Sequence, residues 1–178
     1  MVTERFERRL AAILVADVVG YSKLINTDEE ATIAGLSRLL TEIVRPGIAE
    51  RGGRIFKLVG DGVLAEFPSV IEAVRAAAEL QLALAERNAT AEGAQRIEFR
   101  IGVNVGDVVV DGDDLHGDGV NVASRLEALA EPGGICISAS AHEQVRDRAG
   151  ISFEDMGEQQ LKNMDRPVRA WRWVQETL

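Results

Sequence analysis

Two aspartates stand where apolar segments of the chain end. Asp17 follows the apolar run of residues 10–16, and Asp61 lies between two glycines in RIFKLVGDGVLAEF, residues 54–67. A carboxylate that directly follows an apolar run costs stability unless it is solvated or binds a cation. Two such acids at one site would suit hard divalent cations, and ions about 3.5–4 Å apart suit in-line displacement at phosphorus. The alternative is that both acids are ordinary turn residues.

A second pair of polar residues, Asn121 and Arg125, lies four positions apart in VNVASRLEALAE. On a helix this spacing places both side chains on one face, opposite the apolar Val122, Leu126 and Leu129. The preceding loop, DGDDLHGDG, carries glycines, and a helix that begins after such a loop attracts anions to its N-terminus. The pair therefore suits an anionic ligand, although a solvated helix face has the same pattern.

Lys57 is a charged residue inside the apolar strand that precedes Asp61. Four residues of extended chain separate the two backbones by roughly 10–13 Å. One phosphate group therefore does not easily reach Lys57 and a metal ion on Asp61 of the same chain. Lys57 is either a surface lysine on a half-exposed strand or a contact for the far end of a ligand, across a dimer interface.

The elements that must position these residues include several strands. The apolar run at 10–19 is typical of a strand buried on both faces. Residues 54–67 predict a hairpin that turns at Gly60-Asp61-Gly62. Residues 97–103 alternate between apolar and polar side chains, which predicts a half-buried strand, and 108–110 predict a further short strand.

Helices are expected between these strands. A Ser or Thr followed three residues later by Glu predicts helices that begin at Thr27, Ser69 and Ser140. With a helix over VNVASRLEALAE and a last strand over VRAWRWV, the order predicts an α+β fold. We expect a ferredoxin-like βαββαβ core with a mainly antiparallel sheet, covered by helices on one face, and a small C-terminal α/β extension. In this sheet Asp17 and Asp61 would be neighbours.

Composition limits the classes of partner. The 178 residues suit one domain, with 46% hydrophobic and 28% charged residues, as in ordinary globular proteins. A net charge of −9 without a basic run argues against nucleic acid as a partner. No apolar segment has the length of a membrane span. The single cysteine, Cys136, lies in an apolar run and is expected to be a core residue, so we expect a cytoplasmic protein.

Five segments, in this order, resemble the class III nucleotidyl cyclase catalytic domain, the family of adenylate and guanylate cyclases. They are ADVVGYS around Asp17, FKLVGDGVLAEF around Asp61, RIGVNVGDVV at 100–109, DLHGDGVNVASR at 114–125 and LKNMDRPVRAW at 161–171. The resemblance covers about residues 8–175 and is greatest to bacterial adenylate cyclases. It implies that residues 1–178 are a single catalytic domain.

The resemblance implies roles for residues of the two halves of a nucleotide site. Asp17 and Asp61 match the metal-binding aspartates, and the backbone carbonyl of Val18 matches a further ligand for two divalent ions, Mg²⁺ or Mn²⁺. Lys57 and Asp114 match the pair that reads the purine. Adenylate cyclases use Lys with Asp or Thr at these positions, whereas guanylate cyclases typically use Glu and Cys.

Three further residues match positions that hold the rest of the nucleotide. Asn121 matches the residue that orients the ribose, and Arg125 matches the one that stabilises charge at the α-phosphate. Lys162 resembles the lysine that holds the β and γ phosphates. Asp107 stands where some members have a basic residue near the phosphates, which is a departure from the family pattern.

The implied reaction is that of an adenylate cyclase, a lyase that converts ATP to 3′,5′-cyclic AMP and pyrophosphate by two-metal-ion catalysis. The family forms head-to-tail homodimers with the nucleotide at the interface, so the expected partners are ATP and a second copy of the chain. One alternative is a catalytically weak cyclase-homology module that dimerises or senses nucleotide, which the complete set of site residues disfavours. The other is a guanylate cyclase, which Lys57 and Asp114 disfavour.

Overall fold

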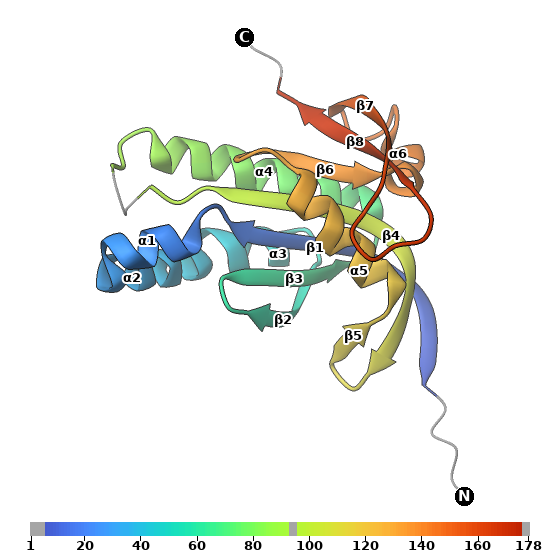
Figure 1. Ribbon diagram of the computed structural model, residues 1–178, viewed down its shortest axis with the longest axis horizontal. Coiled ribbons are helices and arrows are strands. Elements are labelled where there is room, and N and C mark those ends of the chain that lie inside the picture. The colour runs from blue at the N-terminus through green and yellow to red at the C-terminus, as the bar shows by residue number, and fades with distance from the viewer. Residues whose placement is uncertain (1–5, 93–95, 176–178) are drawn as a thin grey trace, which may run out of the picture.

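The computed structural model describes residues 6–92 and 96–175 (Figure 1). Both ends of the predicted 1–178 domain therefore lie outside the described residues. The fold is built around one eight-stranded sheet with the order β2-β3-β1-β4-β6-β8-β7, and β5 pairs with β4. β4 and β6 are parallel, and the other described pairs are antiparallel. The strands are β1 (Glu7–Val18), β2 (Arg54–Val59), β3 (Gly62–Phe67), β4 (Phe99–Asp111), β5 (Asp114–His116), β6 (Ile135–Ser138), β7 (Ser152–Gln159) and β8 (Val168–Val174).

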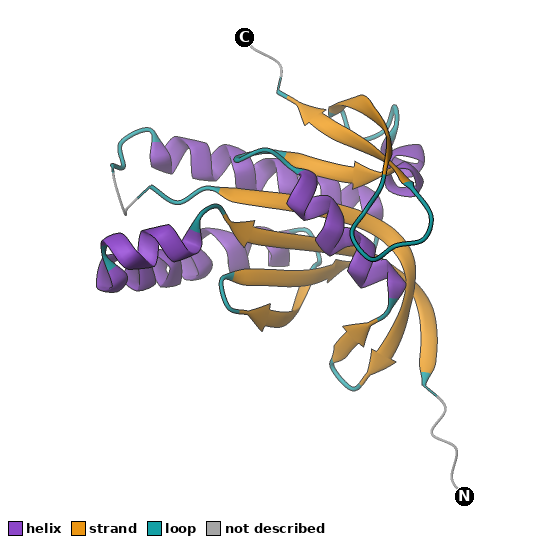
Figure 2. Cartoon of the chain, in the orientation of Figure 1, coloured by secondary structure: helices purple, strands orange, loops and turns teal. Residues whose placement is uncertain are grey.

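Helices alternate with these strands along the chain (Figure 2). The order β1, α1 to α3, β2, β3, α4, β4 confirms the predicted βαββαβ core, and β6, α6, β7 and β8 form the C-terminal extension. The fold class is therefore α+β with a mostly antiparallel sheet, as expected. The helices are α1 (Tyr21–Thr27), α2 (Glu29–Leu39), the π-helical turn η1 (Leu40–Val44), α3 (Arg45–Glu50), α4 (Val70–Asn88), α5 (Asp118–Leu129) and α6 (Ala139–Val145).

Helices cover both faces of the sheet, so the expectation of one covered face is wrong. In Figure 1, α5 crosses in front of the central strands and α4 lies behind them. Alternate side chains of β1 point to the two layers, because successive residues of a strand face opposite ways. Ala12, Leu14 and Ala16 pack against the α2 to α4 side, and Ala11, Ile13 and Val15 pack against the α5 side. This confirms that β1 is buried on both faces.

The position of α5 also corrects the prediction for the strand that begins near residue 97. β4 is a single strand that continues through Gly106 and Asp107, where the sequence predicts a break. Its second face is buried rather than solvated, because α5 lies directly on it. Asn104 is buried there and its Nδ2 donates to the Gly119 carbonyl at 3.0 Å. The alternating pattern therefore predicted a solvated face because Gly102 and Asn104, which lie beneath α5, count as polar positions in the sequence.

Helix starts follow side-chain capping, at positions that differ in part from those predicted. Ser69 caps α4 as expected, accepting from a backbone N–H at 3.2 Å. The prediction for Thr27 is wrong, since it is the last residue of α1 and Asp28 caps α2. The prediction for Ser140 is wrong too, because Ser138 caps α6. In both cases an oxygen-bearing side chain close to the predicted one meets the free N–H groups of the first turn.

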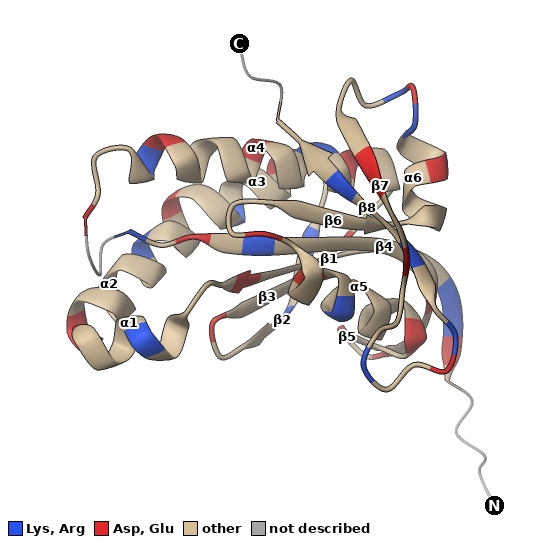
Figure 3. Ribbon diagram, turned by 45° about the horizontal axis from the view of Figure 1, so that its top comes forward, with Lys and Arg blue, Asp and Glu red and all other residues tan. Residues whose placement is uncertain are grey.

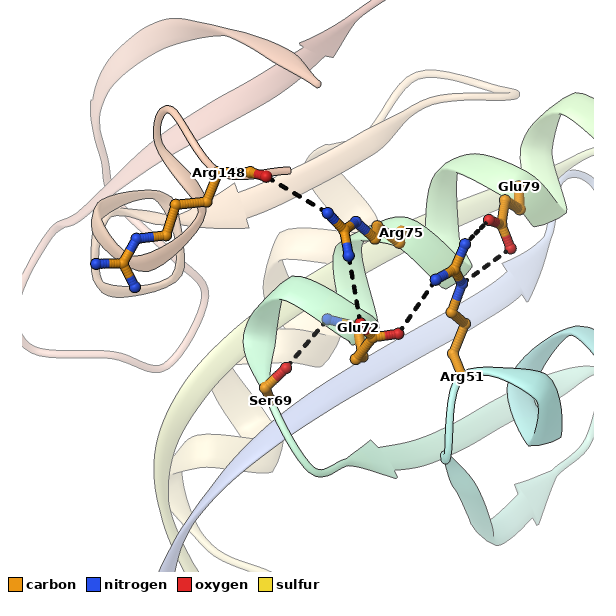
Figure 4. Close-up of polar contacts among 6 residues, drawn as sticks. All are labelled: Arg51, Ser69, Glu72, Arg75, Glu79 and Arg148. Atoms are coloured by element: carbon orange, nitrogen blue, oxygen red, sulfur yellow. Dashed lines mark hydrogen bonds and ion pairs between the residues drawn. The ribbon is translucent and has the colours of Figure 1, made fainter. Parts of the chain in front are cut away.

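An arginine–glutamate network joins α3, α4 and the segment after α6 (Figure 4). The Arg51 guanidinium lies 3.4 Å from Glu72 Oε2 and 3.2 Å from Glu79 Oε2. Arg75 donates to Glu72 and to the Arg148 carbonyl, each at 3.4 Å. These groups are partly exposed, so each pair adds little stability on its own. The network lies in the helical layer on the side of the sheet opposite α5.

Charged residues of both signs are interspersed over the elements in Figure 3. Within residues 6–92 and 96–175, no helix is both long and apolar enough to cross a membrane. Cys136 is buried in a cluster with Val122 and Leu126 of α5, which agrees with its expected place in the core. Burial raises the pKa of its thiol to about 12.

Candidate active site

The pairing of β1 with the β2–β3 hairpin brings Asp17 and Asp61 together. Ala16 lies opposite Val63, so the tip of the hairpin lies beside the end of β1. The Val18 N–H donates to Asp61 Oδ2 at 3.0 Å. The predicted neighbourhood of the two acids is therefore present in the fold, between elements that are far apart in sequence.

The hairpin turn is shorter than predicted. Val59 pairs with Gly62, so the turn consists of Gly60 and Asp61 alone. Gly60 has φ of 59°, a left-handed conformation that glycine adopts without strain, and it occupies the first position of a two-residue turn. This tight turn fixes the backbone of Asp61 at the end of two paired strands.

The environment of the acids is strongly negative. Burial, then a hydrogen bond and charge repulsion from Asp61, raise the pKa of Asp17 to about 7, against the opposing charge of Arg100. Arg100 lies across from Asp17 on β4. Burial and the charges of Asp17 and Asp61 also raise the pKa of Glu127, on α5, to about 7. Asp17, Asp61 and Glu127 thus lie in one region, and Arg100 is the arginine whose charge lowers the pKa of Asp17 and of Glu127.

Sequence reasoning missed Glu127, although a signal for it exists. Val120, Ala123 and Glu127 are spaced i, i+3 and i+7, so they share one stripe of α5. The first two are buried against the sheet and Glu127 is half-buried. An acid on a buried stripe of a helix would have indicated a polar site beneath it.

The donor set around Asp17 and Asp61 fits divalent cations. Their carboxylate oxygens are hard ligands, and a bound cation would offset the burial and the charge of Asp61 that raise the pKa of Asp17. Among the described residues, no three or more His, Cys, Asp or Glu side chains are grouped as a metal cage. Two aspartates would therefore leave most coordination positions to a nucleotide and water. The predicted role of the Val18 carbonyl stays a prediction.

A second group of polar residues lies on β2 and β5. Lys57 Nζ is 3.0 Å from Asp114 Oδ2, and the Leu115 N–H donates to Asp114 Oδ1 at 2.8 Å. Burial alone would raise the pKa of Asp114, but the hydrogen bond from Lys57 and that from Leu115 hold it below its ordinary value. His116 Nε2 lies 3.3 Å from the same carboxylate. The predicted base-reading pair is thus in direct contact within one chain.

The remaining predicted residues keep their polar groups available. Asn121 is exposed and Arg125 is half-buried on α5, and Lys162 is exposed between β7 and β8. None of the three side chains forms a hydrogen bond or ion pair with another described residue. The fold of one chain does not bind them to Asp17 or Asp61. Because their donors have no partner among the described residues, they are available to bind a ligand.

Comparison with known proteins now identifies the family. Residues 3–173 match the family model of the adenylate and guanylate cyclase catalytic domain. The chain belongs to this cyclase family. The matched range contains every site residue predicted above, and it covers β1 to β7 in full and β8 except for its last residue.

Named relatives and solved structures agree with this assignment. A Rhizobium meliloti (strain 1021) protein with the provisional name adenylate cyclase 3 is 49% identical over 173 residues, 97% of this chain and 30% of its own length. An adenylate cyclase of Streptomyces coelicolor is 34% identical over 152 residues, 85% of this chain and 38% of its own length. The cyclase domain thus spans about a third of the length of these relatives.

The fold of the cyclase domain is also that of solved relatives. The crystal structure of an adenylate/guanylate cyclase/hydrolase from Silicibacter pomeroyi is 44% identical, with a TM-score of 0.90 over 97% of this chain and 100% of that one. The adenylyl cyclase CyaB from P. aeruginosa is 26% identical, with a TM-score of 0.82 and 98% coverage of both chains. The resemblance found in the sequence motifs is therefore confirmed at the level of family and fold.

Proposed function

We propose that this cyclase domain, residues 1–178, is an adenylate cyclase that converts ATP to 3′,5′-cyclic AMP and pyrophosphate. The observation that carries the proposal is the pair of Lys57 and Asp114, whose charged atoms lie 3.0 Å apart. Adenine presents an amino donor at position 6 and an acceptor at position 1, whereas guanine presents the reverse order. Asp114 accepts from the amino group and Lys57 donates to the ring nitrogen. Names of relatives support the same choice.

Asp17 and Asp61 hold two divalent cations, Mg²⁺ or Mn²⁺, in this proposal. When bound, the cations supply positive charge for the triphosphate and for ionisation of the ribose 3′-hydroxyl. The aspartates keep these charges at the end of β1, where the Val18 N–H fixes the Asp61 carboxylate. The proposal draws support from the burial of Asp17 and the nearby charge of Asp61, which raise the pKa of Asp17 and which a bound cation would offset.

Other residues orient the nucleotide and stabilise charge on it. Asn121 positions the ribose so that the 3′-oxygen faces the α-phosphorus. Arg125 donates to the α-phosphate oxygens, where negative charge increases during attack, and Lys162 holds the β and γ phosphates. All three side chains are free of partners among the described residues, so binding breaks no existing contact.

The two half-sites belong to different copies of the chain in a head-to-tail homodimer. Lys57 and Asp61 lie on one hairpin but face different ligands, because the extended strand keeps their backbones roughly 10–13 Å apart. Leu58 and Val59, between them, are 47% and 57% exposed. Large apolar side chains that stay exposed beside a site suit burial in an interface. One such dimer would hold two complete sites at its interface.

A mixing experiment tests both the activity and the shared site. The purified chain is incubated with ATP or GTP and Mg²⁺ or Mn²⁺, and cyclic nucleotide is measured. Asp17→Ala and Asn121→Ala are each expected to be inactive, and an equal mixture should recover about a quarter of wild-type activity. Random exchange makes half of the dimers heterodimers, each with one intact site of two. An inactive wild type, or product from GTP alone, contradicts the proposed reaction, and an inactive mixture contradicts the shared site.

A further inference from the structure

The β4–β5 hairpin that carries Asp114 is attached to β2 at a second point, Arg54. Arg54 Nη1 donates to the Asp113 carbonyl at 2.8 Å. Asp113 precedes Asp114 in the turn, so the two contacts from β2 reach adjacent residues of the same hairpin tip. Lys57 makes the other contact, at 3.0 Å.

The arginine is itself held in place by a partly buried carboxylate. Arg54 Nε and Nη2 both donate to Glu66 Oε1, at 3.0 Å and 2.8 Å. Arg9 Nη2 lies 2.7 Å from Glu66 Oε2, and the Glu66 side chain is only 15% exposed. Burial alone would raise the pKa of Glu66, but the hydrogen bonds from Arg54 and Arg9 hold it below its ordinary value. Arg54 is therefore oriented by residues of β3 and β1, the next two strands of the sheet.

The hairpin has few other means of holding its tip. Asp111 pairs with Asp114, so Gly112 and Asp113 form a two-residue turn, and β5 has only three residues. Leu115 anchors the base of the hairpin, because its side chain is buried in the apolar layer beneath α5. The Leu115 N–H and His116 contact the Asp114 carboxylate from within β5 itself. Among the described residues, the polar contacts that join the hairpin tip to another strand come from Arg54 and Lys57, and the Lys57 ammonium group must turn to the nucleotide.

We propose that Arg54 is a positioning residue for purine selectivity, holding Asp114 in place through the Asp113 carbonyl while Lys57 contacts the base. The inference rests on the proposed function, because it assigns Asp114 to the base. Arg54 touches neither the nucleotide nor the reacting atoms. Glu66 contributes to the same positioning, because its carboxylate fixes the plane of the guanidinium that reaches Asp113.

Kinetic and binding measurements on Arg54 variants test this role. Arg54→Ala is expected to raise KM for ATP about 5–20-fold, to leave kcat within about twofold, and to reduce the preference for ATP over GTP. Arg54→Lys keeps the positive charge but lacks the planar set of N–H donors of the guanidinium. It should therefore retain more of the preference for ATP over GTP than Arg54→Ala does. Glu66→Gln should reduce the preference for ATP over GTP, as Arg54→Ala does. Arg172→Ala is the matched control, because Arg172 forms a similar two-nitrogen contact with Glu154 at the other end of the sheet.

Two measurements that need no turnover separate the inference from the proposed reaction. Calorimetric dissociation constants for ATP and GTP report selectivity, and amide hydrogen exchange across residues 109–116 reports opening of the hairpin. Faster exchange there together with a lower ATP preference in Arg54→Ala supports the positioning role. An unchanged binding ratio overturns it, even if exchange increases. A wild type that binds ATP selectively without producing cyclic AMP refutes the proposed reaction and leaves the role of Arg54 supported or overturned by the binding ratio.

Discussion

Gly102 allows α5 to lie directly on β4, and adding one methyl group there should displace Asn121 and Arg125, which α5 carries. A Cβ on this residue would lie 2.3 Å from the Ala123 carbonyl oxygen and 2.4 Å from the Glu127 nitrogen. Both are backbone atoms, so no side-chain rotation relieves the overlap. Carbon–oxygen contacts normally lie at about 3.3–3.6 Å, so α5 must move away by roughly 1 Å.

The expected effect of Gly102→Ala follows from what α5 carries. Overpacking of this kind costs about 1–3 kcal/mol of folding free energy, which lowers the urea midpoint by roughly 0.5–1.5 M. Asn121 and Arg125 move with the helix, and a displacement near 1 Å reduces kcat about 100-fold. The assay is cyclic AMP production, with circular dichroism to verify folding and urea titration to measure stability.

Gly35→Ala is the matched control for this variant. Gly35 lies within α2, and its added Cβ would lie 3.3 Å from Ile97 Cδ1, the end of a flexible side chain. In a helix interior alanine is also favoured over glycine. Stability and kcat should therefore stay near wild type. Wild-type kcat and urea midpoint in Gly102→Ala would refute the argument that close contact of α5 with β4 sets the geometry of the site.

Two further predictions concern the base-reading pair and a histidine outside the site. Lys57→Glu combined with Asp114→Cys should reduce kcat/KM for ATP relative to GTP by at least about 10-fold, since the donor and acceptor toward the base are exchanged; an unchanged ratio would remove both residues from base recognition. His142 stacks on Trp171 at 3.6 Å, and burial followed by the charge of Arg146 lowers its pKa below the ordinary 6.5. Its contribution to stability is present above pH 6.5 and is lost as the pH falls through the lower folded value. Urea midpoints between pH 7.5 and 5.5 should therefore fall less for His142→Phe than for wild type, and equal falls would contradict this cause.

Local pattern predicted the elements well and their neighbours less well. The continuous apolar run of β1 correctly predicted burial on both faces, because such a run leaves no polar side to face water. The alternation at residues 97–103 wrongly predicted a solvated face, because Gly102 and Asn104 count as polar positions whether they contact water or a helix. Asp28 and Ser138 took the caps predicted for nearby residues, since several oxygen-bearing side chains compete for the same N–H groups.

What the sequence determined about this protein is its family and the identity of its candidate site residues. Asp17 and Asp61 could be identified as candidates because a carboxylate beside apolar residues costs folding free energy, and the order of residues alone shows where that occurs. The tertiary structure decided which charges act on one another. Glu127 enters the carboxylate region, and Arg54 reaches the Asp113 carbonyl, only because sheet pairing and helix packing bring distant segments within a few ångströms. Electrostatic coupling depends on distance and burial, which sequence spacing does not contain.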